Sequence, residues 1–232
     1  MPLTSIPHQA GATLVSRRTT LGGIALAATA LAATTLARPA MAQRGGGNVS
    51  VDELMKPGDL PDIVVGKPEA PVTIVEYASM TCPHCAAFHN TVYPQLKTKY
   101  IDPGKARLIF REYPLDDRAM AASMLARCVG GEGPAGFIGE LFKRQETWAF
   151  APGNLVVAKL FETAKQAGFT QASFDKCLTD QKLLEQISAI RKRAGDKFQI
   201  SSTPTFFVNG TRLAGGSLAD FDKLIEPLLP KS

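Results

Sequence analysis

The feature that most constrains this chain of 232 residues is the run Cys82-Pro83-His84-Cys85, which stands between two different patterns. The apolar run 72–77, typical of a strand, ends just before it, and apolar residues at helical spacing begin at Phe88. A strand that passes directly into a helix places Cys82 at the helix N-terminus. Unpaired backbone N–H groups and the helix dipole favour an anion there. We therefore expect the Cys82 thiol to have a lowered pKa and to act as a nucleophile.

Cys85 lies one helical turn further on, on the same side, and can close a short disulfide with Cys82. A structural zinc site would need four ligands, usually from two such pairs, and the chain has no second one, even if His84 and His89 are counted. A c-type haem site needs His directly after the second cysteine, where Ala86 stands. A purely structural disulfide across one helical turn would constrain almost nothing. The motif therefore predicts redox chemistry on the sulfurs, with no metal and no cofactor.

The first 42 residues have the composition of an export signal. They contain Arg17 and Arg18 but no acidic residue, followed by a mildly apolar stretch and a small-x-small site that ends at Ala42. We expect cleavage after Ala42 and a periplasmic location. The arginine pair resembles a twin-arginine signal, but Thr20 stands where that class usually has Phe, so the ordinary secretory route stays open. An uncleaved membrane anchor also stays open.

Charge gives no support for nucleic-acid binding. The formal net charge is +5, and three of the arginines lie within residues 1–42, so the remainder carries +2. No basic cluster with interleaved aromatic residues remains after residue 42. All four cysteines do remain, an even number that suits an oxidising compartment.

The chain after the signal predicts an α/β fold. Residues 43–60 are Gly-rich and then proline-punctuated, which indicates a tether with room for a short helix. Residues 61–115 read as an edge strand, the strand before the cysteines, a helix from His84 to Tyr100 bent at Pro94, and a second strand. The strands on either side of that helix should be parallel.

The rest of the chain first departs from this pattern and then returns to it. Residues 116–180 carry four stretches of helical spacing, one of them 137–150, separated by Gly/Pro loops. We expect an inserted helical domain there. Residues 181–232 predict a long helix, a hairpin at Asn209-Gly210 and a last helix, which rejoin the first α/β part.

Two motifs together resemble one family. The cysteine motif, the run 203–210 (TPTFFVNG) and the helices between them resemble the DsbA family of exported thiol:disulfide oxidoreductases over about residues 60 to 230. The resemblance implies a thioredoxin fold with an inserted helical domain. It also implies a cis Thr203-Pro204 bond that faces the cysteines and lies beside the backbone that binds an extended substrate. The implied partners are exported polypeptides and a membrane redox partner that resets the active site.

The residues of the motif take separate roles in this interpretation. Cys82 is the exposed attacking and attacked sulfur, and Cys85, which faces inward, resolves the mixed disulfide. His84 stabilises the Cys82 thiolate, or else is a solvated loop residue. Glu76 matches an acidic residue that the family keeps below the disulfide. It is interpreted as a proton carrier for Cys85 or, on equal terms, as one half of an ion pair with a basic neighbour.

The remaining cysteines, Cys128 and Cys177, lie near the ends of two helices of the inserted domain, and we expect a structural disulfide between them. The predicted function is a monomeric oxidase that exchanges disulfides with exported proteins. The segment before the first strand is too short for a dimerisation domain of the kind that exported isomerases carry. Thr203 before the proline also occurs in isomerase-like and reductase-like relatives, so these directions stay open. A role in cytochrome or metal-centre assembly, and a role as a non-catalytic peptide-binding chaperone, stay open as well.

Overall fold

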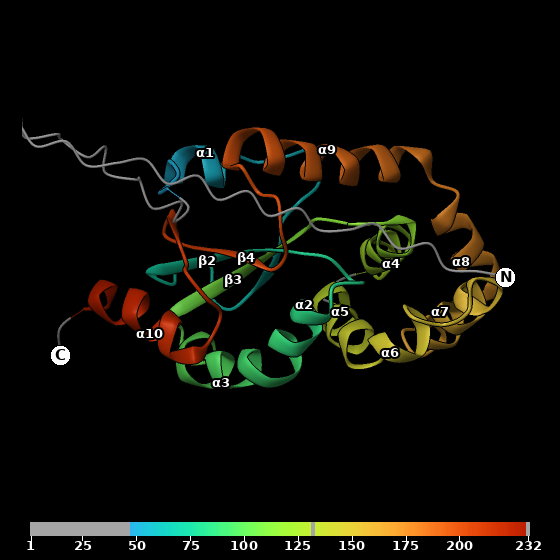
Figure 1. Cartoon of the computed structure of the whole chain (residues 1–232), viewed down its shortest axis with the longest axis horizontal. Coiled ribbons are helices and arrows are strands. Elements are labelled where there is room, and N and C mark those ends of the chain that lie inside the picture. The colour runs from blue at the N-terminus through green and yellow to red at the C-terminus, as the bar shows by residue number, and fades with distance from the viewer. Residues whose placement is uncertain (1–46, 131–132, 231–232) are drawn as a thin grey trace, which may run out of the picture. The chain divides into compact units, whose positions relative to one another are not determined.

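The computed structural model describes residues 47–130 and 133–230. The predicted signal, residues 1–42, lies outside them. A five-stranded mixed sheet of order β1-β3-β2-β4-β5 carries helices on both faces (Figure 1). The strands are β1 (Ile63–Val65), β2 (Val72–Ala78), β3 (Ala106–Glu112), β4 (Thr205–Val208) and β5 (Thr211–Arg212). The α-helices are α1 (Val51–Met55), α2 (Pro83–Ala87), α3 (Tyr93–Leu96), α4 (Asp117–Cys128), α5 (Gly133–Lys143), α6 (Gln145–Trp148), α7 (Val156–Lys165), α8 (Gln171–Leu178), α9 (Gln181–Phe198) and α10 (Leu218–Ile225).

Strand pairing confirms the predicted α/β fold. β2 pairs with β3 in parallel, and β1 joins β3 as an antiparallel edge strand. β4 pairs antiparallel with β2, and β5 returns along β4 through the turn at Asn209-Gly210. This arrangement makes β2 the central strand, and the two cysteines follow its C-terminal end.

Alternate residues of the central strands supply two separate cores. On one face Ile74 belongs to a cluster with Phe88 and with Phe221 of α10. On the other face Val75 belongs to a cluster with Phe198 of α9 and with Leu54 of α1. Both strand residues are fully buried, which suits the near-continuous apolar sequence of β2.

The helical path after the cysteines runs to Ile101 rather than ending at Tyr100. It is not one α-helix bent at Pro94. Two π-helical segments, Phe88–Val92 and Lys97–Ile101, alternate with α2 and α3. Pro94 has no N–H to donate, and the wider π turn directly precedes the short α-helix in which it lies.

Helices α4 to α8 surround one core cluster, which also contains Met80 and Cys85. The predicted helix over 137–150 is two helices, because the chain turns at Arg144 between α5 and α6. Helix α9 serves both parts: Leu183 and Ile187 belong to the cluster of the inserted domain, while Ala194 and Phe198 belong to a cluster with the sheet. The core beside the active-site cysteines is thus shared with the inserted domain.

The segment predicted as a tether is partly folded. Leu54 of α1 is only 1% exposed, and the backbone N–H of Val49 donates to the carbonyl of Gly210 at 2.8 Å. Ser50 caps α1 by accepting a hydrogen bond from the N–H of Glu53. Helix α1 is the short helix for which the sequence left room within residues 43–60. The buried Leu54 and arginines from β3 and α9, which donate to carbonyls of α1, dock it on the rest of the fold.

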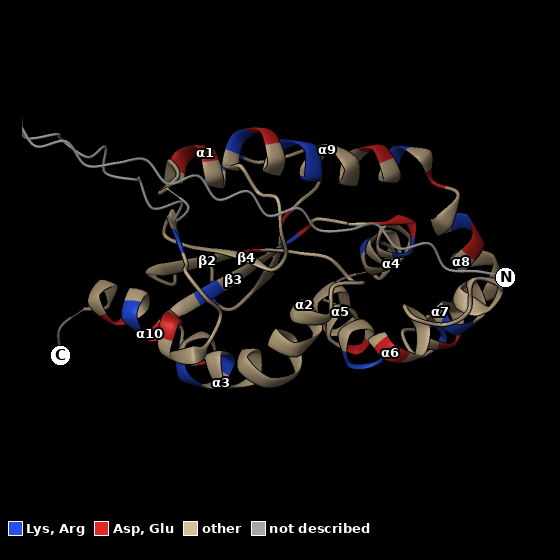
Figure 2. Cartoon of the chain, in the orientation of Figure 1, with Lys and Arg blue, Asp and Glu red and all other residues tan. Residues whose placement is uncertain are grey.

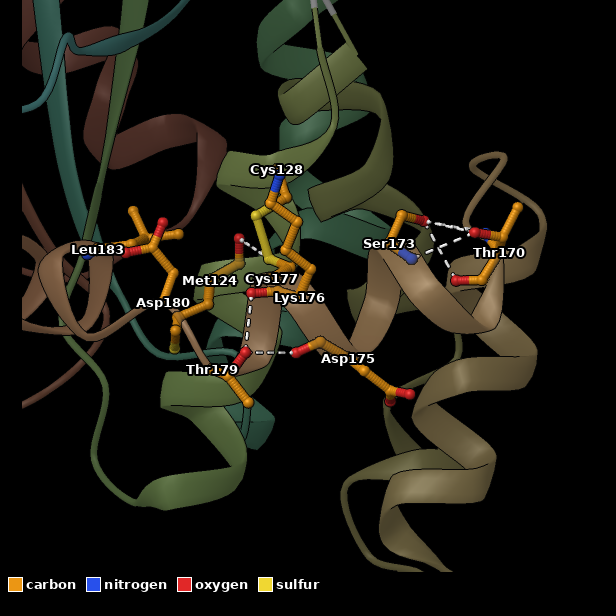
Figure 3. Close-up of a disulfide and its surroundings, with 10 residues drawn as sticks. All are labelled: Met124, Cys128, Thr170, Ser173, Asp175, Lys176, Cys177, Thr179, Asp180 and Leu183. Atoms are coloured by element: carbon orange, nitrogen blue, oxygen red, sulfur yellow. Dashed lines mark hydrogen bonds between the residues drawn. A yellow bond between two sulfur atoms is a disulfide. The ribbon is translucent and has the colours of Figure 1, made fainter.

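A disulfide joins Cys128, at the end of α4, to Cys177 in α8 (Figure 3). The two Cα atoms are 6.2 Å apart and the residues are 49 positions apart in sequence. Helix α8 begins with a reciprocal capping box between Thr170 and Ser173, also visible in Figure 3. The bond thus links the first helix of the inserted domain to its last. Within residues 47–130 and 133–230, no helix is both long and apolar enough to cross a bilayer.

Candidate active site

Cys82 is the N-cap residue of α2, and Pro83 occupies the first turn. Proline suits this position because its missing N–H would have no helical partner anyway. The preceding turn is fixed by polar contacts: the N–H of Cys82 donates to the carbonyl of Ser79 at 3.1 Å, and the hydroxyl of Thr81 donates to Asp116 at 2.8 Å. The reactive sulfur therefore sits on a turn that is held from both sides.

The environment of Cys82 favours its thiolate. A hydrogen bond from the Cys85 thiol, with further help from Thr203 and from the backbone N–H groups of Cys85 and His84, lowers the pKa of Cys82 to about 5, against the opposing effect of burial. As a thiol, Cys82 donates to the carbonyl of Thr203 across 3.2 Å. Figure 2 shows no Lys, Arg, Asp or Glu on α2. Hydrogen bonds, rather than a Lys or Arg side chain of that helix, stabilise the anion.

Cys85 has the opposite character. Its side chain is fully buried, and burial, its hydrogen bond to Cys82 and the negative charge of Glu76 raise the pKa of Cys85 far above the ordinary value. Cys82 and Cys85 are not joined by a disulfide in the structure. At neutral pH the pair therefore holds one proton on Cys85 and one negative charge on Cys82. Cys82 itself is only 6% exposed, so the attacking sulfur is less open than the sequence interpretation had it.

Pro83 and His84 are both exposed. The contribution of His84 to the lowered pKa of Cys82 comes from its backbone N–H. Stabilisation by the imidazole ring stays a prediction. The described ranges contain no group of three or more His, Cys, Asp or Glu that could hold a metal ion.

Glu76 is fully buried in β2, opposite Phe110 of β3 and Phe206 of β4. Its partner is His89, whose Nε2 lies 3.1 and 3.0 Å from the two carboxylate oxygens. The ring of His89 stacks on Phe142 with centroids 4.3 Å apart. Sequence reasoning considered His89 only as a metal ligand. Its place four residues after Cys85, on the same helix face, was the signal that could have indicated the pair.

The run that begins at Thr203 lies across from the cysteines. The Thr203-Pro204 bond is cis, and the Thr203 carbonyl accepts the hydrogen bond from Cys82. The hydroxyl of Thr203 is buried, and the side chain of Thr203 helps to lower the pKa of Cys82. The structure thus brings five predicted site residues into one place: Cys82, Cys85, Glu76, Thr203 and Pro204.

A cavity of about 340 Å³ opens beside the reactive turn. It is lined by Thr81, which precedes Cys82, and by residues of α4 and of the segment after α6. Phe150, on its wall, has 49% of its surface exposed. Phe150 thus shares this cavity with Thr81, the residue before Cys82.

Three comparisons show which known proteins this chain resembles. A model of the thioredoxin family matches residues 59–227. Alpha-DsbA1 of Wolbachia pipientis, a solved structure, is 33% identical and superposes with a TM-score of 0.70 over 77% of this chain and 95% of that one. The chain is a DsbA-like member of the thioredoxin family. The DsbA-like chain also shares its fold with BdbD of Bacillus subtilis, which is 22% identical and has a TM-score of 0.63 over 79% of this chain and 96% of that one.

Curated sequences include a Rickettsia bellii protein provisionally named a protein-disulfide oxidoreductase. It is 35% identical over 170 residues, which are 71% of this chain and 65% of that protein. Four further Rickettsia relatives match over 60 to 62% of their length. The DsbA-like chain therefore spans less than two thirds of the Rickettsia proteins that it matches.

Proposed function

We propose that this DsbA-like protein is a thiol:disulfide oxidoreductase that acts outside the cytoplasm, as an oxidase of exported polypeptides. The observation that carries the proposal is the split between the two sulfurs: hydrogen bonds lower the pKa of Cys82 to about 5, while burial raises that of Cys85. A stabilised thiolate stabilises the reduced enzyme, and a stable reduced form makes the disulfide a strong oxidant.

The reaction moves two electrons from substrate to enzyme. A substrate thiolate attacks Cys82 in the Cys82–Cys85 disulfide and forms a mixed disulfide, while Cys85 leaves and takes up a proton. The second substrate thiolate then attacks the substrate sulfur, the mixed disulfide breaks, and Cys82 leaves as a thiolate. The products are a substrate disulfide and an enzyme with one thiolate and one thiol. A sulfur of low pKa leaves fastest, so Cys82 suits this last step.

The reverse direction meets an obstacle at Cys85. A reductase needs Cys85 to lose its proton before it can resolve a mixed disulfide, and the raised pKa of Cys85 opposes that loss. Glu76, buried nearby with His89, is the candidate proton carrier for Cys85 in either direction. The groups proposed to receive the substrate are the backbone at Thr203 and Pro204, which contacts Cys82, and Phe150 in the cavity that Thr81 lines.

The direction of disulfide exchange is tested with protein that starts at Gln43. This protein is equilibrated with glutathione. Reduction potentials measured for other proteins run from about −270 mV in thioredoxin to about −120 mV in DsbA. We expect a value near the second, together with oxidative refolding of a reduced client and little reduction of insulin. A potential near that of thioredoxin would make the protein a reductase, and isomerisation of a scrambled client without net oxidation would make it an isomerase. Peptide binding without any exchange would leave only a chaperone.

Export, a membrane partner that reoxidises the active site, and a monomeric state belong to the same proposal. Fractionation of cells, with the mature N-terminus read by mass spectrometry, should place the protein in the periplasm with residue 43 first. Light scattering of the purified protein should give the mass of one chain. A chain that keeps residues 1–42, or a dimer, would contradict the respective part.

A further inference from the structure

The side-chain amide of Gln145 is buried in the inserted helical domain and bonded to the active-site turn. Gln145 opens α6 and is only 2% exposed. Its Nε2 donates to the carbonyl of Met80 at 2.8 Å and to the carbonyl of Cys82 at 3.0 Å. An amide nitrogen carries two N–H groups, so both are used on these two acceptors.

The two carbonyls stand on either side of the turn that carries the reactive sulfur. Met80 follows the end of β2, and Cys82 is the N-cap of α2. The Cys82 carbonyl also accepts the N–H of Ala86 at 3.2 Å, the first bond of the helix. The same helical turn directs the backbone N–H groups of His84 and Cys85 to the Cys82 sulfur. One side chain from a distant part of the sequence thus bridges the strand end and the helix start.

Attachment of α6 to its surroundings does not depend on this amide. Trp148, in the same helix, is fully buried and donates to the carbonyl of Leu141 at 2.8 Å. Arg118 of α4 donates to the carbonyl of Ala149, directly after α6. Gln145 falls at the apolar spacing of Phe137, Leu141 and Trp148, where an apolar side chain would fit the core. A buried amide at such a position is costly unless its bonds serve a purpose.

We propose that Gln145 is a positioning residue for disulfide exchange: its amide fixes the Met80 and Cys82 carbonyls so that the first turn of α2 keeps its N–H groups on the Cys82 sulfur. The inference rests on the proposed exchange chemistry at Cys82 but not on its direction. Loss of the bridge affects the thiolate more than the disulfide, because only the thiolate depends on those N–H groups for charge stabilisation.

Gln145→Met in the reduced, full mature protein tests this. Methionine has a similar length but no N–H. Followed by the ultraviolet absorbance of the thiolate, the pKa of Cys82 should rise by about one unit, and the equilibrium constant with glutathione should fall about tenfold toward less reduced enzyme. The matched control is Trp148→Phe, which also removes a buried N–H···O bond from α6, but one whose acceptor is the carbonyl of Leu141 in α5 rather than a carbonyl of the active-site turn. It should lower the melting temperature and leave the Cys82 titration unchanged.

A lower melting temperature of Gln145→Met with an unchanged Cys82 titration would overturn the proposal and make Gln145 a purely structural contact. Equal shifts in Gln145→Met and Trp148→Phe would overturn it too, since general loosening would then explain both. If Gln145→Met fails to fold, Gln145→Asn decides: it keeps the amide but is one methylene too short to span both carbonyls. A rise in the pKa of Cys82 in Gln145→Asn, smaller than the rise of about one unit expected for Gln145→Met, supports the proposal. An unchanged Cys82 titration in Gln145→Asn refutes it. Absence of exchange activity in the parent protein would refute the proposed function and leave this titration comparison readable.

Discussion

Nε2 of His89 lies within 3.1 Å of both carboxylate oxygens of Glu76, and the two side chains are 6% and 0% exposed. The carboxylate lies in the central strand, between two phenylalanines of the neighbouring strands. Burial of a charge there costs free energy unless a partner compensates for the lost water. Its negative charge also helps to raise the pKa of Cys85. The pair thus links the buried sulfur to the first helical segment after the motif.

Glu76→Gln should bring the pKa of Cys85 down and slow exchange. The amide removes the negative charge that opposes the Cys85 thiolate, and it also removes a proton carrier. Stopped-flow oxidation of a thiol client at several pH values measures both effects. Glu112→Gln is the matched control, because Glu112 is equally buried and is paired with Arg127 instead. It should reduce stability while the pH dependence of exchange stays that of the parent. Identical pH–rate profiles for Glu76→Gln and the parent would make Glu76 purely structural.

Alkylation of the reduced protein should reach half its maximal rate near pH 5, with the label on Cys82. A free thiol would need a pH near its ordinary pKa of 9.0. Mass spectrometry of the labelled peptide identifies the sulfur. Cys82→Ser should abolish exchange, whereas Cys85→Ser should accumulate mixed disulfides with clients, because nothing then resolves them. Faster labelling of Cys85 than of Cys82 would reverse the assigned roles.

The reduced protein should be more stable than the oxidised one, by an amount that depends on pH. The pKa of Cys82 is about 5 in the folded reduced state and 9.0 in an ordinary thiol. A depressed pKa adds stability that is complete above the unfolded value and is lost as the pH falls through the folded one. Melting temperatures of the two forms should therefore differ more at about pH 8 than at about pH 4. A disulfide form that melts higher at the upper pH would contradict the oxidase.

Removal of the second disulfide should destabilise the protein without changing the chemistry of Cys82. For a separation of 49 residues, Cys128→Ala with Cys177→Ala should lose about 4 kcal/mol in the chain-entropy model. Urea denaturation measures the loss, with the Cys82 titration as internal control. The unaltered protein should show no free thiol at either position by mass spectrometry without reductant. A free thiol there, or equal stability of the variant, would contradict a structural bond.

The strands, the βαβ unit and the position of Cys82 could be predicted because each depends on local pattern: an apolar run, a helical period and the turn signal at Asn209-Gly210. The His89 partner of Glu76 was missed, because a spacing of four residues from Cys85 places His89 near that sulfur but does not identify a residue of β2 as its partner. Gln145 was missed for another reason: a polar residue at apolar spacing shows burial but not its acceptors, which lie more than sixty residues away. Docking of Leu54 likewise depends on side chains from distant strands.

The disulfide between Cys128 and Cys177 also has a consequence for how each new copy of this protein folds. A disulfide forms only when two electrons leave its thiols, so each new chain has to be oxidised once before its inserted domain is complete. The newly made molecule is thus a client of the kind of reaction proposed for the mature one. Each chain therefore needs an oxidant while it folds, either an already oxidised copy of the same protein or another acceptor of electrons.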